Sequence, residues 1–220
     1  MSSFLYPSLT GTPSEPLDPA ANTTTLLLEL AETVRATWAD ADAADTASVA
    51  ANHDALSAAA TLIAAASTSG GRVLVIGNGG SACDGDRFVR LLRSIRPTPA
   101  SARSLLDPAI VSALANDVGA ARLFSRQVET YARPGDVVVV FTTSGASANV
   151  IDAVEAAKLA GASTIAFAGY NGGLLRTHTD VDVCITVKSS SVHRIQETQG
   201  ALVDALVDLV ATGPKHEVRP

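Results

Sequence analysis

The sequence predicts an α/β protein whose parallel sheet is flanked by helices. Short runs rich in valine and isoleucine alternate with longer stretches of helical periodicity, and Gly/Ser-rich turns follow two of the runs. Parallel strands need crossover connections, which helices supply. The 220 residues, 47% of them hydrophobic and 17% charged, suffice for one buried core. We therefore expect a three-layer α/β sandwich that forms a single domain over residues 23–212.

The first part of this domain is expected to be helical. Apolar residues recur at spacings of three and four from about Thr23 to Trp38 and from about Ala44 to Ala66, with few helix breakers. The alanine-rich faces of these helices favour close packing. Before them, Pro7, Pro13 and other prolines lie among serine, threonine and glycine, so residues 1–22 are predicted to be a flexible tail. Residues 213–220 are expected to be a second tail.

The remaining elements follow in alternating order. Apolar runs of strand length are interpreted as strands, and the stretches of helical periodicity between and after them are interpreted as helices. The predicted strands are 72–77, 136–142, 163–168 and 182–187, and the predicted helices are 82–95, 108–131, 148–160 and 193–211.

Composition excludes several classes of function. Sixteen basic residues against twenty-two acidic ones give a net charge of −6, so no basic field favours direct binding of nucleic acid. The apolar stretches fall short of the roughly 20 residues that span a bilayer, which argues against a membrane protein. Cys83 and Cys184 lack metal-type spacing, and the N-terminus shows no cleavable signal, so we expect a cytoplasmic protein.

Two turns carry the strongest functional signal, because each follows an apolar strand and precedes a helical pattern. The first is GNGGS at residues 77–81, and the second is TTSGAS at residues 142–147. Small residues let the backbone approach an anion, N–H groups at a helix start point at it, and hydroxyls add donors. Ligands of parallel sheets bind at the carboxyl ends of the strands, where both turns fall. We therefore predict a phosphorylated small molecule as the ligand.

Two other interpretations of these turns stay open. In the first, Ser147 is an ordinary helix N-cap, a position where hydroxyl residues are common. In the second, Gly77, Gly79 and Ala82 form a dinucleotide fingerprint, G-x-G-x-x-A. A dinucleotide site needs an acidic residue at the end of the next strand, and residues 97–106 contain none.

A set of segments gives the chain a family resemblance. GNGGSA, Asn116-Asp117, FSR at 124–126, TTSGAS, NGG at 171–173 and RIQE at 194–197 occur in the order seen in sugar isomerase (SIS) domains. The chain resembles the phosphoheptose isomerase branch over roughly residues 25–210. This resemblance implies a five-stranded parallel sheet, N-terminal helices used in oligomerisation, a homotetramer with sites near subunit interfaces, and a heptose phosphate-like ligand.

The resemblance also assigns roles to individual positions. Two groups follow from it: the phosphate-binding residues are Thr142, Thr143, Ser144 and Ser147, and the sugar-contacting residues are Asn78, Gly79, Ser81, Asp117 and Gln196.

The catalytic positions depart from the family pattern. Phosphoheptose isomerases carry a His and, four residues later, a Glu in the helix after GNGGS, where this chain has Arg87 and Leu91. Their RIQE helix carries a His eight residues after the Gln, where this chain has Asp204. The same His, Glu, Gln and His bind zinc in some members, and of that set only Gln196 is kept. An amide oxygen alone does not hold zinc, so we predict no metal and no cofactor.

Because Arg87 and Asp204 differ from the family together, we expect their side chains to approach each other, with the guanidinium roughly in the place of the ion. Two independent surface charges are the alternative. If the protein isomerises its ligand, the remaining acid/base candidates are Glu197, Asp204 and His193.

Two functions follow. The first is a phosphosugar-binding sensor, scaffold or regulatory protein without ordinary isomerase activity. A replication-initiation regulator of this branch lacks the same Glu and second His and binds an initiator protein, so a protein partner is also expected. The second is an active isomerase of a sedoheptulose 7-phosphate-type substrate that uses substituted residues.

Overall fold

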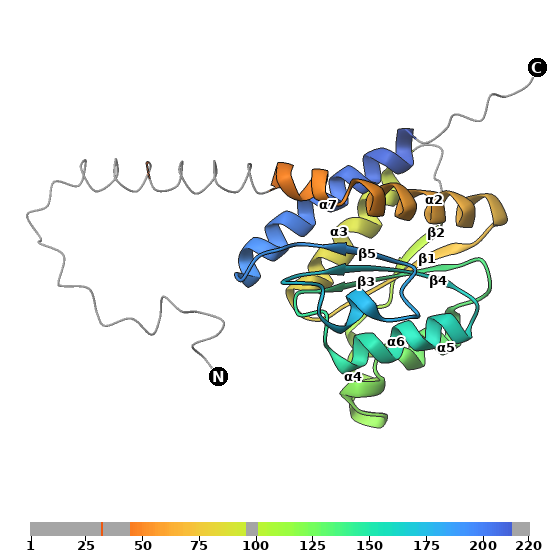
Figure 1. Cartoon of the computed structure of the whole chain (residues 1–220). Coiled ribbons are helices and arrows are strands. Elements are labelled where there is room, and N and C mark those ends of the chain that lie inside the picture. Colours follow the sequence, from red (N-terminus) through yellow and green to blue (C-terminus); the bar gives the residue numbers. More distant parts are fainter. Residues whose placement is uncertain (1–31, 33–44, 96–100, 213–220) are drawn as a thin grey trace, which may run out of the picture. The chain divides into compact units, whose positions relative to one another are not determined.

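The computed structural model describes residues 45–95 and 101–212, together with Glu32. All of these except Glu32 belong to the second of two units into which the chain divides, which begins at Asp45 (Figure 1). The tails predicted over 1–22 and 213–220 lie outside the described residues, as does the helix predicted over 23–38 apart from Glu32.

Five parallel strands form a single sheet, which confirms the predicted fold class. In chain order they are β1 (Arg72–Gly77), β2 (Ser101–Ser104), β3 (Val137–Thr142), β4 (Ser163–Ala168) and β5 (Val183–Thr186). The order across the sheet is β2-β1-β3-β4-β5, with every neighbouring pair parallel. The direction of winding therefore reverses between β1 and β3, and this reversal decides where a ligand can bind.

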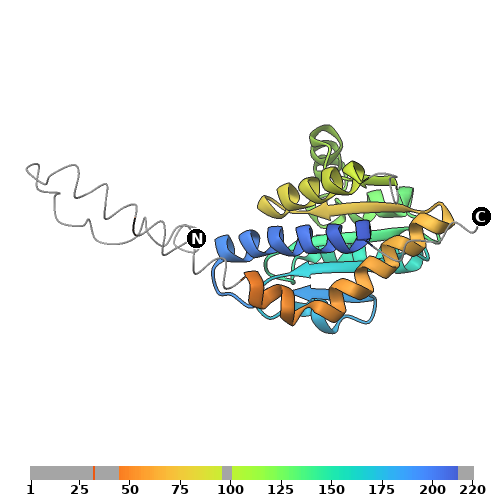
Figure 2. The same cartoon turned by 90° about the horizontal axis from the view of Figure 1, so that it is seen from above.

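Helices cover both faces of the sheet. Figure 1 shows α2 (His53–Ser69), α3 (Gly80–Ser94) and α7 (Val192–Thr212) above it, and α4 (Pro108–Asp117), α5 (Ser125–Tyr131) and α6 (Ala148–Leu159) below. The view from above shows the three upper helices lying over the sheet, with α3 and α7 running roughly along the strands (Figure 2). The short 3-10 helices η2 (Ala120–Arg122) and η3 (Gly173–Thr177) complete the described elements.

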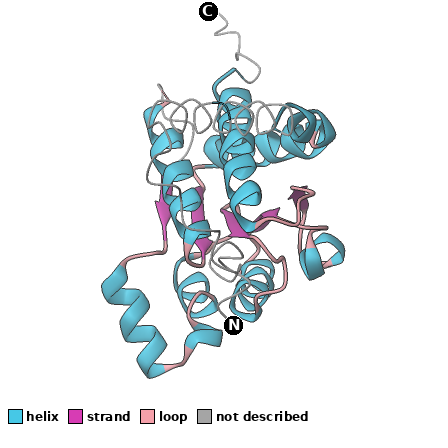
Figure 3. Cartoon of the chain, turned by 90° about the vertical axis from the view of Figure 1, so that its left-hand side faces the viewer, coloured by secondary structure: helices cyan, strands magenta, loops and turns pink. Residues whose placement is uncertain are grey.

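Two predicted helices are interrupted. The helix predicted over 108–131 is wrong as a single element, because α4 ends before Gly119, whose φ of 84° is unfavourable for residues with a side chain. The chain then passes through η2 into α5, and α4 projects from the rest of the domain without a buried residue (Figure 3). The helix predicted over 44–66 is likewise broken, at Asn52.

Asn52 is buried at this break and holds the last residue of β5. Its Oδ1 accepts a hydrogen bond from the Thr186 N–H at 2.8 Å, and its Nδ2 donates to the Thr186 carbonyl at 3.0 Å. A buried amide that satisfies both backbone groups of one residue fixes the strand end firmly. The carboxyl end of β5 is therefore tied to the helical layer above it.

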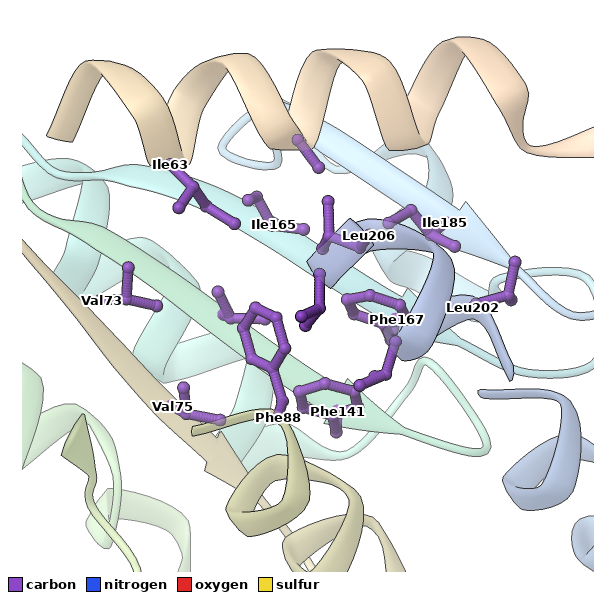
Figure 4. Packing of buried hydrophobic residues seen from close by; sticks show 14 of the residues in the cluster. Ile63, Val73, Val75, Phe88, Phe141, Ile165, Phe167, Ile185, Leu202 and Leu206 are labelled. Atoms are coloured by element: carbon purple, nitrogen blue, oxygen red, sulfur yellow. The ribbon is translucent and has the colours of Figure 1, made fainter. Parts of the chain in front are cut away.

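The core has two parts, one on each face of the sheet, because alternate residues of a strand point to opposite sides. In β3, Val137, Val139 and Phe141 face α2, α3 and α7, whereas Val138 and Val140 face α5 and α6. Phe88 of α3 packs on the rings of Phe141 and Phe167, with centroids 6.0 and 6.4 Å away (Figure 4). Phe141 and Phe167 stack at 4.6 Å. This aromatic cluster joins α3 to the sheet at the strand ends that carry the predicted site.

Candidate functional site

The two predicted turns lie side by side at the carboxyl edge of the sheet. Gly77 at the end of β1 is opposite Phe141 of β3, so the turn after β1 and the loop at 142–147 leave the sheet at the same level. They flank the point where the strand order reverses. In doubly wound sheets this crevice is where ligands bind. The candidate site is therefore formed by these two turns and the start of α7.

The hydroxyls of the second turn have different tasks. Thr142 is buried, and its Oγ1 accepts a hydrogen bond from the Gly145 N–H at 3.2 Å. Ser144 Oγ is exposed, accepts from the Ala146 N–H at 3.2 Å and lies 3.5 Å from Ser147 Oγ. Thr142 thus holds the shape of the loop, whereas the two serine hydroxyls lie together near the start of α6.

Ser147 occupies the N-cap position of α6, but its side chain makes no capping hydrogen bond. Asp107, by contrast, caps α4 fully by accepting from the N–H groups of Ala109 and Ile110. The interpretation of Ser147 as an ordinary N-cap residue is therefore not supported, because the expected capping hydrogen bond is absent. The first turn of α6 also has no acidic residue, so an anion there would meet no carboxylate in that turn.

The dinucleotide interpretation finds no support beyond the turn itself. Asp107, the first acidic residue after β2, is used as the cap of α4. Close packing explains instead why glycine occupies two positions of the first turn. A Cβ at Gly77 would lie 2.7 Å from the Ser81 carbonyl oxygen, and a Cβ at Gly80 would collide with the side-chain amide of Gln196.

Gln196 therefore lies directly against the first turn, although it comes from α7. Ser81 is buried in the first turn of α3, and Gly79 has the positive φ of 55° that the turn requires. The neighbouring Gln199 is fully buried and donates from Nε2 to the Thr142 carbonyl at 3.1 Å, which ties α7 to the second turn as well.

Asn149 is a site residue that the sequence analysis missed. Its amide forms two reciprocal hydrogen bonds with the amide of Asn78, at 2.9 and 3.0 Å. This pair bridges the turn after β1 and the first turn of α6. The signal available in the sequence was its position two residues after Ser147 in the helix that follows TTSGAS.

The predicted sugar-contacting residues do not all converge. Asn78, Gly79, Ser81 and Gln196 gather around the first turn. Asp117 lies at the end of α4, where it accepts a hydrogen bond from the neighbouring Asn116 at 2.9 Å.

Arg87 and Asp204 form the expected ion pair. Nη2 of Arg87 lies 2.7 Å from each carboxylate oxygen of Asp204, and Nη1 donates to the Gly200 carbonyl at 3.0 Å. The guanidinium thus joins α3 to α7. The side chains are 39% and 52% exposed, so solvent screens the pair, and its contribution to stability is small.

The donor set that the resemblance assigns to zinc does not fit a metal in this chain. Both oxygens of Asp204 are bound to a guanidinium, Leu91 offers only hydrocarbon, and Gln196 supplies one amide. A borderline-soft dication needs imidazole, thiolate or carboxylate ligands. Within residues 45–95 and 101–212, no group of three or more His, Cys, Asp and Glu is placed to hold a metal ion.

The acid/base candidates are engaged in different ways. Glu197 is paired with Arg194 of the same helix turn at 2.8 Å, and Asp204 is paired with Arg87. His193 lies exposed in the first turn of α7. Two of the three candidates are therefore carboxylates held by arginine.

Asp84 is a further carboxyl group in α3, close to Arg87, and its environment is unusual. Its Oδ2 is buried without a hydrogen-bond partner. Burial raises the pKa of Asp84 from 3.8 to about 6, and the positive charge of Arg87 opposes this rise only in part.

The stability of the protein is expected to fall as the pH rises from 4 to 6, because the folded protein holds the Asp84 proton more tightly than the unfolded chain does. The variant Asp84→Asn should show a smaller fall. Urea unfolding midpoints measured at intervals between pH 4 and 7 test this. Equal slopes for the two proteins would show that Asp84 does not titrate in this way.

Comparisons with known proteins agree with the fold. Residues 38–169 match the family model described as "SIS domain". The chain is 41% identical over 146 residues to a phosphoheptose isomerase of Roseiflexus sp.. This match covers 64% of the present chain and 73% of the Roseiflexus protein. It is 40% identical over 166 residues to the phosphoheptose isomerase of Chlorobaculum parvum, and this match covers 72% of the present chain and 78% of the relative.

Solved structures give the same result. A phosphoheptose isomerase from Neisseria gonorrhoeae superposes with a TM-score of 0.75 at 34% identity, over 82% of this chain and 98% of that one. The phosphoheptose isomerase from Francisella tularensis superposes with a TM-score of 0.72 at 31% identity, over 81% of this chain and 96% of that one. None of the helices in the described part of the chain has the length and hydropathy needed to cross a bilayer. The chain belongs to the SIS-domain family, in its phosphoheptose isomerase branch.

Proposed function

We propose that this protein binds a heptose phosphate-like sugar at the carboxyl edge between β1 and β3 without ordinary metal-dependent isomerase activity. It would then work as a sensor, a scaffold or a regulatory protein. The observation that carries this proposal is the ion pair in which Nη2 of Arg87 contacts both carboxylate oxygens of Asp204. The resemblance assigns the family's acid/base and metal-binding groups to these two positions.

The chemistry of isomerisation explains why this pair matters. Moving a proton between adjacent carbons of a ketose and an aldose phosphate needs a base and an acid within reach of both carbons. A guanidinium does not lose its proton in proteins, and a leucine side chain has none to exchange. Asp204 is held by Arg87 through both of its oxygens. None of these three residues can readily take the roles that the family gives to histidine and glutamate.

Binding is supported by features that are independent of this pair. The exposed hydroxyl of Ser144 lies beside that of Ser147, at the start of α6. The Ser147 hydroxyl makes no capping hydrogen bond, and the first turn of α6 contains no acidic residue. Backbone donors at a helix start and neighbouring hydroxyls suit a phosphate group. Asn78 and Asn149 place amides beside it, where sugar hydroxyls need partners.

One observation favours the alternative, an active isomerase with substituted residues. Asp84 has a pKa of about 6, close to the range in which a carboxyl group can both accept and return a proton. Asp84 would join Glu197, Asp204 and His193 as a candidate in that case. The homotetramer, the protein partner and the cytoplasmic location stay predictions that rest on the resemblance and on composition.

An NMR time course of sedoheptulose 7-phosphate with the purified protein, with and without zinc, tests both functions. We expect ligand lines to broaden without conversion to an aldose phosphate. The variant Ser144→Ala should weaken binding by about 1–3 kcal/mol, the usual value of a hydrogen bond to a charged group. Conversion at a steady rate would support the isomerase instead, and unchanged affinity in the variant would place the phosphate elsewhere.

A further inference from the structure

The paired amides of Asn78 and Asn149 join the two halves of the proposed site. Asn78 follows β1, whereas Asn149 lies in the first turn of α6, which follows the loop at 142–147. Asn78 Nδ2 donates to Asn149 Oδ1 at 2.9 Å, and Asn149 Nδ2 donates to Asn78 Oδ1 at 3.0 Å. Because both bonds depend on which way each amide is turned, each residue fixes the orientation of the other.

The rest of the chain does not hold the two partners equally. Asn78 lies between two glycines of the first turn, so no side chain of an adjacent residue restricts it. Asn149 precedes the fully buried Val150, in a helix of 12 residues whose inner face packs in the core. Groups on a packed helix are held more precisely than groups on a loop. The helix therefore positions Asn149, and Asn149 in turn positions Asn78.

The paired amide of Asn78 keeps hydrogen-bonding capacity for a ligand. It uses one N–H and one lone pair of its oxygen in the pair, so its second N–H points away from Asn149 in the amide plane. The side chain of Asn78 is exposed, and that of Asn149 is half-buried. An amide that is already oriented loses less side-chain entropy on binding a sugar hydroxyl than a freely rotating one does.

The backbone of Asn149 belongs to the phosphate half of the site. The N–H of Val150 bonds to the Ser147 carbonyl at 3.0 Å, whereas the N–H groups of Ala148 and Asn149 precede the first bond within the helix. N–H groups in this position bind anions. A substitution that changes only the side chain at 149 leaves this backbone donor in place, so the contributions to sugar binding and to phosphate binding can be separated.

We propose that Asn149 is a positioning residue of the site, which orients the Asn78 amide toward the sugar and so favours a sugar phosphate over bare phosphate. This inference rests on the proposed function, because the phosphate must occupy the loop at 142–147 for the sugar to reach Asn78. Asn149 acts on the sugar through Asn78, not by direct contact.

Phosphorus NMR titrations with sedoheptulose 7-phosphate and with inorganic phosphate test the inference, and the readout is the ratio of the two affinities. In Asn149→Ala this ratio should fall about fivefold, because Asn78 loses both bonds that orient it, whereas the affinity for inorganic phosphate should stay within about twofold. The matched variant Asn149→Asp keeps an acceptor for Asn78 Nδ2. Its negative charge at the helix start should weaken the binding of both ligands but leave their ratio close to that of the unmodified protein.

A double-mutant cycle separates positioning from direct contact. If Asn149 acts through Asn78, the variant Asn78→Ala should weaken binding of the sugar phosphate, and the double variant should bind it no more weakly than Asn78→Ala does. Additive losses would show that each amide contacts the sugar independently, which would overturn the inference.

The outcomes also separate the inference from the proposed function. If the unmodified protein binds neither ligand, the proposed function fails, and the inference fails with it. If the sugar phosphate binds but Asn149→Ala keeps the ratio, or lowers both affinities equally, the inference is overturned while the proposed function stands. A ratio that falls as far in Asn149→Asp as in Asn149→Ala would likewise contradict a positioning role.

Discussion

Replacing Gly145 by alanine is expected to lower phosphosugar affinity at least about 100-fold and to destabilise the protein by about 2–4 kcal/mol. Gly145 has a φ of 62°, and a Cβ there would collide with the carbonyl oxygen of Gly172. The added methyl group must push apart the loop at 142–147 and the turn at 169–173. Because the N–H of Gly145 also bonds to Thr142, the loop would lose the contact that sets its shape. Calorimetry and urea unfolding measure the two effects.

The matched control for this variant is Gly70→Ala. Gly70 has a similar φ of 74° at the C-cap of α2, but nothing lies within 4 Å of the position of a Cβ. Its substitution adds the backbone penalty alone, about 1 kcal/mol, and should leave binding intact. If Gly145→Ala binds phosphosugar as well as Gly70→Ala does, the loop at 142–147 is not the phosphate site.

The strands that could be predicted were those with a run of apolar residues. β1, β3 and β4 read as continuous hydrophobic runs, which is typical of the interior of a parallel sheet. β2 was missed because its sequence is SARS and only Ala102 is buried. A strand with one apolar residue carries no apolar pattern, so the fifth strand was expected only from the family resemblance.

The candidate site was predicted in part for a similar reason. The turns at 77–81 and 142–147 are local in sequence, so their composition shows them directly. The bond between Asn78 and Asn149 joins residues 71 positions apart, and no local pattern indicates it. The pair between Arg87 and Asp204 was expected because the resemblance indicates that both positions are substituted together, and their charges are complementary.

The triple variant Arg87→His, Leu91→Glu and Asp204→His is expected to bind zinc with a Kd of about 1 µM or tighter, whereas the unmodified protein should not. Positions 87 and 91 lie one turn apart on the same face of α3, and positions 196 and 204 share a face of α7. The contact between Arg87 and Asp204 shows that these two faces meet. Two imidazoles, a carboxylate and the Gln196 amide would then surround one point, which is a suitable set for zinc.

Competition against a chromophoric chelator measures the zinc affinity, and the NMR time course measures turnover of sedoheptulose 7-phosphate. The double variant Arg87→His and Asp204→His, which keeps Leu91, should bind zinc at least about tenfold more weakly because it lacks the carboxylate ligand. A folded triple variant that binds no zinc would contradict the proposal that the ion pair stands where the family holds its metal. A triple variant that both binds zinc and converts the sugar would show that the fold and the phosphate site are intact. The side chains at positions 87, 91 and 204 would then account for the lack of turnover that we propose for the unmodified protein.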